Sequence, residues 1–276
     1  MKISIITPVR NGRNFIGRTM DSVLSQTAVI SGRVDLEYIV VDGASDDDTL
    51  DVIHSRRHAS IHVISERDKG MYDALAKGFR IASGDVVAYI NAGDHYHESA
   101  FDIVQEVFCN SSVSWATATN FQCNEALQIT NFFQPIRYKG KLIRRGMYGT
   151  TLPPIQQEST FWRRSLLELI NFDRLSSLRY AGDFYLWHCF SIQERLWIVR
   201  SFLGAFTVHR GQLSEVSRRE YDLEFEQIVS KSPSILWNTL GVFERVLHYV
   251  PSIIRRKLGI EQLIVFNHQR GVWHQS

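Results

Sequence analysis

Cysteine is scarce in this chain of 276 residues, and its scarcity excludes two kinds of fold. The three cysteines, Cys109, Cys123 and Cys189, form no CxxC pair. An odd and sparse set argues against a disulfide framework and against a structural zinc site. We therefore expect a protein that works in a reducing compartment.

Long apolar runs and a strong charge of one sign are also missing. No stretch reaches the ~18 apolar residues of a membrane-spanning helix, and the apolar run near Met1 is too short for a signal peptide. The formal net charge is only +2, so composition favours no nucleic acid as partner. We expect a cytoplasmic protein, and contact with the inner face of the cytoplasmic membrane stays open.

The first ~95 residues alternate between strand-like and helix-like segments. Such alternation indicates an α/β fold with a largely parallel sheet covered on both faces. Ligands bind such sheets beyond the carboxyl ends of the strands. The expected strands are Ile3–Val9, Glu37–Val41, Ile61–Ile64 and Val86–Ile90, and the expected helices are Ile16–Leu24, Asp46–Ile53 and Met71–Ala82.

The second half is less regular. Its patterns predict strands at Ser114–Thr119 and Gln128–Phe133, and helices at Phe101–Phe108, Phe161–Ile170 and Asp183–Ile192. A basic run from Arg137 to Arg145 is typical of a solvated strand face, and a place near an anionic acceptor is the alternative.

An apolar stripe at helical spacing marks the C-terminal part, with a bend expected at Pro251. Core packing, a partner interface and contact with a membrane surface all fit this stripe, and the basic residues Arg255–Lys257 favour the membrane. The stripe consists of Leu236, Leu240, Phe243, Leu247, Val250 and Ile254.

Polar motifs follow each expected strand of the first half, where a nucleotide diphosphate sugar would bind. A carboxylate such as Asp42 can accept hydrogen bonds from a nucleobase N–H, and Lys69 can meet a phosphate. The motifs are Thr7-Pro8-Val9-Arg10-Asn11, Asp42-Gly43-Ala44-Ser45, Glu66–Ala74 and Asn91-Ala92-Gly93-Asp94.

These motifs, taken in order, resemble those of family 2 glycosyltransferases. VVDGASDDDT at 40–49, ERDKGMYDA at 66–74 and NAGD at 91–94 match three of the family's signatures. Three further matches follow at Gln156–Arg164, Ala181–Trp187 and Val208–Ser214. Each motif alone is weak, but six in the family's order are a specific signal over roughly residues 1–225.

The resemblance implies a GT-A-type fold, with a Rossmann-like, largely parallel sheet flanked by helices. It implies a glycosyltransferase domain at 1–225, with a nucleotide-sugar half at 1–95 and an acceptor half at 96–225. An amphipathic helical extension would follow at 226–276.

The implied activity is inverting transfer of a sugar from a nucleotide diphosphate sugar, with a UDP-sugar as the expected donor. The implied acceptor is a glycan or a lipid-linked saccharide, such as a polyprenyl-linked glycan, in surface polysaccharide biosynthesis.

The resemblance also assigns roles to residues. Asp183 would be the general base that takes the acceptor hydroxyl proton, and Asp42 would read the nucleobase. Gln157, Glu158 and Trp162 would form the acceptor side. The implied donor-binding residues are Thr7, Pro8, Val9, Asn11, Asp42, Lys69, Asn91, Gly93 and Asp94.

A divalent cation, Mn²⁺ or Mg²⁺, is the implied cofactor, because negative charge develops on the leaving diphosphate. The resemblance assigns the cation to Asp94, with His209 as a further metal or diphosphate contact. Many relatives carry two adjacent carboxylates here, whereas Gly93 precedes Asp94 in this chain. A metal or ribose contact is therefore missing or supplied from elsewhere.

Other interpretations stay open. Asp42 suits a turn, Asp94 and Asp183 suit helix N-caps, and His209 and Lys69 suit structural and surface positions. A non-catalytic module that binds a nucleotide sugar or acts as a scaffold is the alternative that Gly93 keeps open. A nucleotidyltransferase would need a glycine-rich loop after the first strand, where residues 7–13 contain only Gly12.

Overall fold

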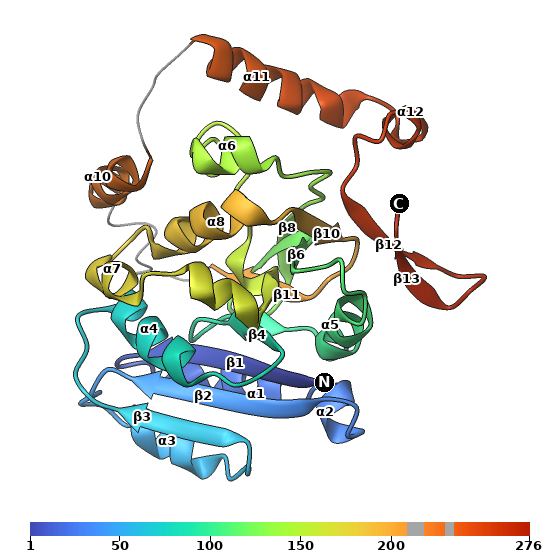
Figure 1. The fold of residues 1–276 in the computed structure, drawn as a ribbon. Helices are drawn as coiled ribbons and strands as arrows, with labels where there is room; N and C mark the ends of the chain where they lie inside the picture. The colour runs from blue at the N-terminus through green and yellow to red at the C-terminus, as the bar shows by residue number, and fades with distance from the viewer. Residues whose placement is uncertain (209–217, 230–234) are drawn as a thin grey trace.

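A nine-stranded sheet runs through the computed structural model, which describes residues 1–208, 218–229 and 235–276 (Figure 1). The strand order is β13-β12-β10-β6-β9-β4-β1-β2-β3. The strands are β1 (Lys2–Val9), β2 (Asp35–Asp42), β3 (Ile61–Ser65), β4 (Val86–Tyr89), β6 (Trp115–Ala118), β9 (Phe161–Arg163), β10 (Leu196–Val199), β12 (Leu263–Asn267) and β13 (Val272–Gln275).

The sheet is largely parallel, as expected. β1 pairs in parallel with both β2 and β4, and only β9 and β13 run antiparallel to their neighbours. β1 is buried over all its residues except Lys2. Strands covered on both faces read as nearly continuous apolar runs, which is why the sequence pattern located them.

Helices cover both faces of the sheet, and successive strand residues point to opposite layers. Ile5 packs with α1 (Ile16–Leu24), α3 (Thr49–Ser55) and α5 (Ala100–Phe108). Ile6 packs on the other face with α4 (Met71–Ile81), α7 (Phe172–Ser177) and α8 (Gly182–Gln193). The strand and helix predictions for the first half are confirmed within a few residues at each end.

A smaller sheet joins the two halves of the chain. It contains β5 (His95–Tyr96), β11 (Gly204–Thr207), β7 (Asn120–Cys123) and β8 (Ile129–Phe133) in the order β5-β11-β7-β8. β5 pairs antiparallel with β11 directly after Asp94. The end of the first half is thereby held against the second half.

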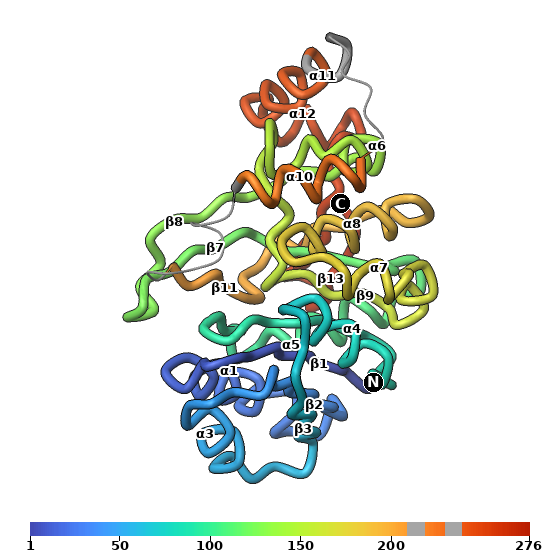
Figure 2. Tube along the Cα trace, turned by 90° about the vertical axis from the view of Figure 1, so that its left-hand side faces the viewer, coloured from blue at the N-terminus to red at the C-terminus, as the bar shows by residue number. Residues whose placement is uncertain are grey.

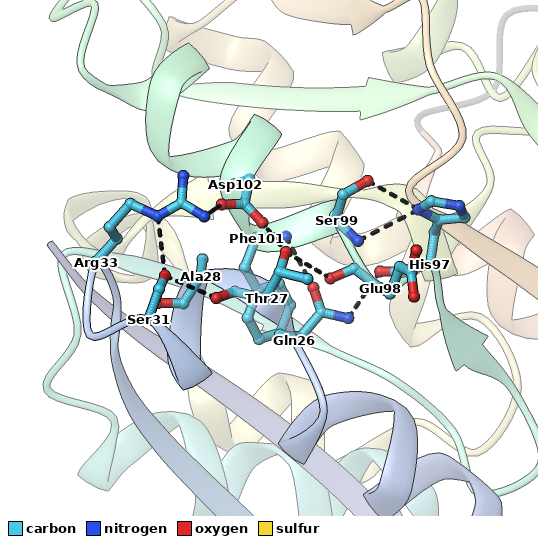
Figure 3. Close-up of polar contacts among 10 residues, drawn as sticks. All are labelled: Gln26, Thr27, Ala28, Ser31, Arg33, His97, Glu98, Ser99, Phe101 and Asp102. Atoms are coloured by element: carbon cyan, nitrogen blue, oxygen red, sulfur yellow. Dashed lines mark hydrogen bonds and ion pairs between the residues drawn. The ribbon is translucent and has the colours of Figure 1, made fainter.

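A polar seam fixes the segment that follows Asp94 (Figure 3). The fully buried Gln26, just before α2 (Thr27–Ile30), donates from Nε2 to the His97 carbonyl at 2.7 Å. Its Oε1 accepts the Phe101 N–H at 2.9 Å. Thr27 adds a hydrogen bond to Asp102. One amide side chain thus ties the start of α5 to the chain after α1.

One helix prediction for the second half is wrong. Within Phe161–Ile170 the chain instead forms β9 and then a 3₁₀ helix, η2 (Arg164–Leu169). β9 inserts between β4 and β6, where Phe161 and Trp162 are both buried. The apolar spacing of this segment is compatible with a helix. The segment instead forms a strand because it pairs with both β4 and β6 and buries its aromatic side chains.

The C-terminal part is only partly helical, so the expectation of a helical extension is wrong for its end. After α10 (Arg218–Ile228), α11 (Ile235–Val246), η3 (Leu247–Tyr249) and α12 (Ser252–Lys257), the strands β12 and β13 join the main sheet. Gly259, at a φ of 60°, follows the end of α12. The bend is confirmed, because Pro251 caps α12. The domain division at residue 225 stays a prediction.

A buried ion pair anchors α11 to the body. Arg137 donates twice to the Glu244 carboxylate, at 2.7 Å each, and Lys139 lies 2.8 Å from it. The basic run therefore is not a strand face: part of it pairs with α11, and Gly140–Arg144 forms α6. Within the described residues, no helix is long and apolar enough to cross a membrane.

Candidate active site

Two loops meet where β1 and β2 end. Val9 and Asp42 are register partners, and the Gly43 N–H donates to the Val9 carbonyl at 2.9 Å. Asn11, with a φ of 51°, donates its N–H to Ser45 Oγ at 2.8 Å and accepts the Asp46 N–H at 3.0 Å. These bonds bring the first two sequence motifs together at the carboxyl end of the sheet.

Asp42 is fully buried at this meeting point. Its carboxylate accepts hydrogen bonds from the Ser45 N–H and hydroxyl and from the Ser65 hydroxyl, the last at 2.7 Å. A carboxylate with these partners shapes the loop in the absence of a ligand. Its role toward a nucleobase stays a prediction.

The other residues expected on the donor side differ in exposure. Thr7, Pro8 and Val9 are buried within β1, and Thr7 Oγ1 lies 3.1 Å from the Tyr38 hydroxyl. Asn11 and Lys69 are exposed. The side chains of Thr7, Pro8 and Val9 therefore belong to the core beneath the loop that follows β1, whereas Asn11 and Lys69 are accessible to solvent.

Asp68 is a residue that the sequence reasoning missed. A Cβ added to Gly43 would lie 2.4 Å from Asp68 Oδ2, so the second and third motifs touch. Burial raises the pKa of the Asp68 carboxyl. Asp68 lies inside the ERDKGMYDA motif, beside Lys69. Its position in this motif was the sequence signal that could have identified it.

Asp94 ends the fourth motif and is only 3% exposed. Its Oδ1 accepts the Thr207 N–H of β11 at 2.8 Å. The residue before it, Gly93, has a φ of 112°, which side chains rarely tolerate. The glycine that departs from a two-carboxylate motif thus has a local backbone reason.

A second carboxylate reaches Asp94 from the other half of the chain. Glu158, in the 3₁₀ helix η1 (Gln157–Ser159), is 5% exposed and interacts electrostatically with Asp94. Burial and the neighbouring Glu158 raise the pKa of Asp94 well above its ordinary range. Burial and, among charges, Asp183 raise the pKa of Glu158 to about 7. Both buried carboxyl groups are therefore harder to ionise than exposed ones.

The remaining acceptor-side residues divide between the site and the core. Gln157 donates to the Tyr89 carbonyl and accepts from Asn91 Nδ2 at 3.4 Å. Asn91 Oδ1 is buried without a hydrogen-bond partner. Trp162 is 0% exposed and packs edge-on against Tyr89. Trp162 thus lies behind the site rather than on its surface, unlike the expectation.

Asp183 opens α8, as the sequence predicted. Its Oδ1 accepts the Phe184 N–H at 2.6 Å and lies 3.5 Å from the Tyr72 hydroxyl. A Cβ on Gly182 would lie 2.3 Å from the Tyr72 ring, so the glycine lets α8 approach α4. Tyr72 is a second residue that the sequence reasoning missed, although it stands in the third motif.

Asp183 lines a pocket with apolar and aromatic walls. Burial raises its pKa to about 6, against the hydrogen bond from the Phe184 N–H, which lowers it. The carboxylate is therefore ionised above about pH 6, as a general base requires. The pocket is lined by Ile143, Tyr148, Gly149, Pro154, Ile155, Asp183, Phe184, Trp187 and Tyr221.

The described residues hold no cluster of three or more His, Cys, Asp or Glu side chains able to bind a metal ion. His209, expected as a metal contact, lies outside the described residues, directly after Val208. The carboxylates near the expected metal position are thus Asp94 and Glu158.

Comparisons with known proteins find glycosyltransferases among the relatives of this chain. An uncharacterized glycosyltransferase of Nostoc sp. is 34% identical over 116 residues, which cover 41% of this chain and 34% of that protein. A Mycobacterium tuberculosis PGL/p-HBAD biosynthesis glycosyltransferase is 27% identical over 163 residues, covering 54% and 62%. The chain thus spans less than two thirds of either relative.

Solved structures share the fold. Staphylococcus aureus TarS 1-349 in complex with UDP-GlcNAc superposes with a TM-score of 0.63 at 17% identity, covering 83% of this chain and 65% of that one. The mannosyltransferase PcManGT of Pyrobaculum calidifontis, in complex with GDP-Man and Mn²⁺, gives 0.56 at 17% identity, covering 89% and 68%. The fold is of the GT-A type. The model of glycosyl transferase family 2 matches residues 4–197, and the chain belongs to that family.

Proposed function

We propose that this protein transfers a sugar, with inversion, from a nucleotide diphosphate sugar to a hydroxyl of a glycan or lipid-linked saccharide. UDP is the nucleotide that we propose, and TarS, with a similar fold, is a UDP-GlcNAc complex. The acceptor belongs, in this proposal, to surface polysaccharide biosynthesis.

One observation carries the proposal: the buried Glu158 lies between the two carboxylates to which the family pattern gives different tasks. It interacts electrostatically with both Asp94 and Asp183. A metal-binding carboxylate and a base near one another are what the transfer needs, because the leaving diphosphate and the attacking hydroxyl flank one anomeric carbon.

The residues present fit a divalent metal ion. Asp94 and Glu158 offer carboxylate oxygens, and Asn91 Oδ1 is a buried oxygen without a hydrogen-bond partner. Oxygen donors of this kind suit Mg²⁺ and Mn²⁺, which complete their coordination with phosphates and water. When bound, the ion would neutralise charge on the leaving diphosphate.

The side chains divide the remaining work. Asp183 would accept the acceptor hydroxyl proton while the glycosidic bond to the new oxygen forms. Asp42 would accept a nucleobase N–H, and Lys69 would face the diphosphate. Gln157 would hold Asn91 in place through its amide contact.

We also propose contact with an anionic membrane surface, on the inner face of the cytoplasmic membrane. The C-terminal helices expose several apolar side chains, and Arg256 and Lys257 lie close to the last of them in the sequence. Such a surface with flanking basic residues is typical of interfacial helices. Its exposed members are Val242, Phe243, Val246, Tyr249, Ile253, Ile254 and Leu258.

A ligand screen followed by a transfer assay tests the proposed reaction. UDP, GDP and their sugars are compared by thermal shift with and without Mn²⁺, because a ligand of the native state raises the melting temperature. We expect UDP and a UDP-sugar with Mn²⁺ to give the largest rise. No stabilisation by any nucleotide sugar, together with no release of nucleoside diphosphate, would refute the function.

A further inference from the structure

Helix α10 holds the turn that leads into the helix of Asp183. The Glu224 carboxylate on α10 accepts hydrogen bonds from three successive N–H groups, those of Arg179 at 2.8 Å, Tyr180 at 2.8 Å and Ala181 at 3.0 Å. Ala181 is the N-cap of α8. The first N–H groups of a helix lack partners within it, and the helix dipole favours an anion there.

The same turn is held from the opposite side by α4. The Tyr72 hydroxyl donates to the Tyr180 carbonyl at 3.2 Å and lies 3.5 Å from Asp183 Oδ1. Tyr180 therefore has its N–H fixed by Glu224 and its carbonyl fixed by Tyr72. Asp183 follows Tyr180 by three residues along the same backbone.

α10 lies near α8 (Figure 1 and Figure 2), and its partly buried residues recur at helical spacing. Tyr221, Glu224, Phe225 and Ile228 are partly buried, whereas Arg219 and Glu220 are exposed. The Phe225 ring lies 4.5 Å from that of Phe184, the residue after Asp183.

Two further contacts, one at Gly146 and one between Tyr221 and Phe225, complete the packing of α10 on the body. A Cβ on Gly146 would overlap the Phe225 ring, at 1.8 Å. Tyr221 stacks on Phe225, with ring centroids 6.0 Å apart, and lines the pocket together with Asp183. α10 thus forms one wall of that pocket and holds its carboxylate-bearing turn.

We propose that Glu224 is a positioning residue for the transfer: by holding Arg179–Ala181 it sets how Asp183 meets the acceptor hydroxyl. The inference rests on the proposed role of Asp183 as general base. Glu224 acts through the backbone turn, which fixes where the oxygens of Asp183 lie. Misplacement of a reacting group by about 1 Å costs on the order of 10² in rate.

The dependence of turnover on pH distinguishes a positioning role of Glu224 from a purely structural one. The titratable groups around Asp183 are Tyr72 from α4, Tyr89 from β4, Tyr221 and Glu224 from α10, and Glu158 from η1. Burial is the main cause that raises the pKa of Asp183. If α10 loosens, solvent reaches Asp183, and the acid limb of turnover moves to lower pH.

The test compares Glu224→Gln with Glu220→Gln, which removes the same charge from an exposed position of the same helix. For Glu224→Gln we expect turnover to fall by roughly 10–100-fold, with donor affinity by calorimetry unchanged and the acid limb at lower pH. Glu220→Gln should behave like the wild type. Glu224→Asp, which keeps the charge, should recover part of the turnover.

A double-mutant cycle with Asp183→Asn decides the mechanism. If Glu224 acts through Asp183, adding Glu224→Gln to Asp183→Asn lowers the residual turnover no further. A full additional fall, or wild-type turnover in Glu224→Gln alone, overturns the inference. Wild-type turnover in Asp183→Asn instead refutes the proposed base. If circular dichroism shows that Glu224→Gln does not fold, the same double-mutant cycle is measured with Glu224→Asp instead.

Discussion

Asp94 and Glu158 form a buried, electrostatically coupled carboxyl pair, although one ends the first half of the chain and the other belongs to the second. Gly93 cannot carry the usual second carboxylate without backbone strain, because its φ is 112°. Glu158 stands where it can take over that part. In the proposed metal site, Glu158 would supply the second carboxylate that the motif lacks.

Asp94→Ala should abolish transfer and the Mn²⁺-dependent part of UDP binding, because it removes the carboxylate assigned to the metal. Glu158→Gln should weaken that same part by about tenfold or more, the effect expected of a residue at or beside the metal. Calorimetry with UDP, with and without Mn²⁺, measures both. The exposed Glu168→Gln is the matched control, and unchanged metal dependence in Asp94→Ala would remove Asp94 from the site.

Asp183→Asn should lower turnover by roughly 10²–10⁴-fold, the usual contribution of a general base, with little change in donor affinity. In the wild type, turnover should fall as the pH drops through about 6, because the pKa of Asp183 is raised to about 6 and only its ionised form accepts a proton. Steady-state kinetics between pH 5 and pH 8 check this. A mutant with wild-type turnover contradicts the assignment, and Glu158 and Asp173 become the next candidates.

Asp42→Ala should weaken UDP binding by roughly 1–3 kcal/mol, the scale of a hydrogen bond to a charged group. Because Asp42 also accepts from Ser45 and Ser65, part of any loss arises from the loop. Ser65→Ala is the control, since it disturbs the loop and keeps the carboxylate. Equal UDP affinity in Asp42→Ala and wild type, measured by calorimetry on folded protein, would make Asp42 purely structural.

Glu37 should make stability depend on acid pH. Burial opposes ionisation of Glu37, but hydrogen bonds from Lys2, Ser4 and Ser83 outweigh it and lower the pKa to about 2. A pKa lowered on folding adds stability above the ordinary pKa of about 4.5, and this stability is lost as the pH falls toward 2.

Glu37→Gln should therefore lower the free energy of unfolding at pH 7 by about 2 kcal/mol or more and flatten its dependence on pH below 5. Urea unfolding of the mutant, the wild type and the exposed-site control Glu106→Gln gives the answer. Identical pH dependence in all three would show that the Lys2–Glu37 contact contributes nothing.

The C-terminal apolar surface predicts binding to anionic vesicles. Tyr249 is 88% exposed and Ile253 is also exposed, so Tyr249→Glu with Ile253→Glu should abolish co-sedimentation without unfolding the protein. Ile30→Glu, on α2 near the opposite end of the molecule (Figure 1), is the control, because Ile30 is 74% exposed. If the wild-type protein does not sediment with lipid, the membrane prediction is refuted and a protein partner becomes the alternative for this surface.

The sequence predicted the first half well, because buried parallel strands and amphipathic helices have different apolar periods. It placed Asp183 at a helix start for the same local reason, since a glycine and an acidic residue precede an apolar run. The residues that define the site through distant contacts were less accessible. Neither the Glu158–Asp94 pair nor the Tyr72–Asp183 contact leaves a periodic trace in the sequence.

The failures also have physical causes. The family resemblance placed Trp162 on the acceptor side, yet its ring is buried and packs against those of Phe79, Tyr89 and Trp187. The C-terminal stripe does not form one face, because the chain breaks at η3: Leu247 is buried while Phe243 and Ile254 are exposed. The side chain of Leu236 lies outside the described residues. Arg255, expected to face a membrane, instead pairs with Glu261 and binds carbonyls near the end of η3.

The parallel pairing of β10 with β12 has a consequence for how the protein is made. β10 ends at Val199, and its partner begins at Leu263, so a nascent chain carries β10 for several seconds before its neighbour exists. During that time one side of β10 presents unpaired backbone groups, which are a template for pairing with another chain. Shortening the chain before β12 would make this exposed edge permanent, so truncated forms should aggregate rather than accumulate as a smaller folded enzyme.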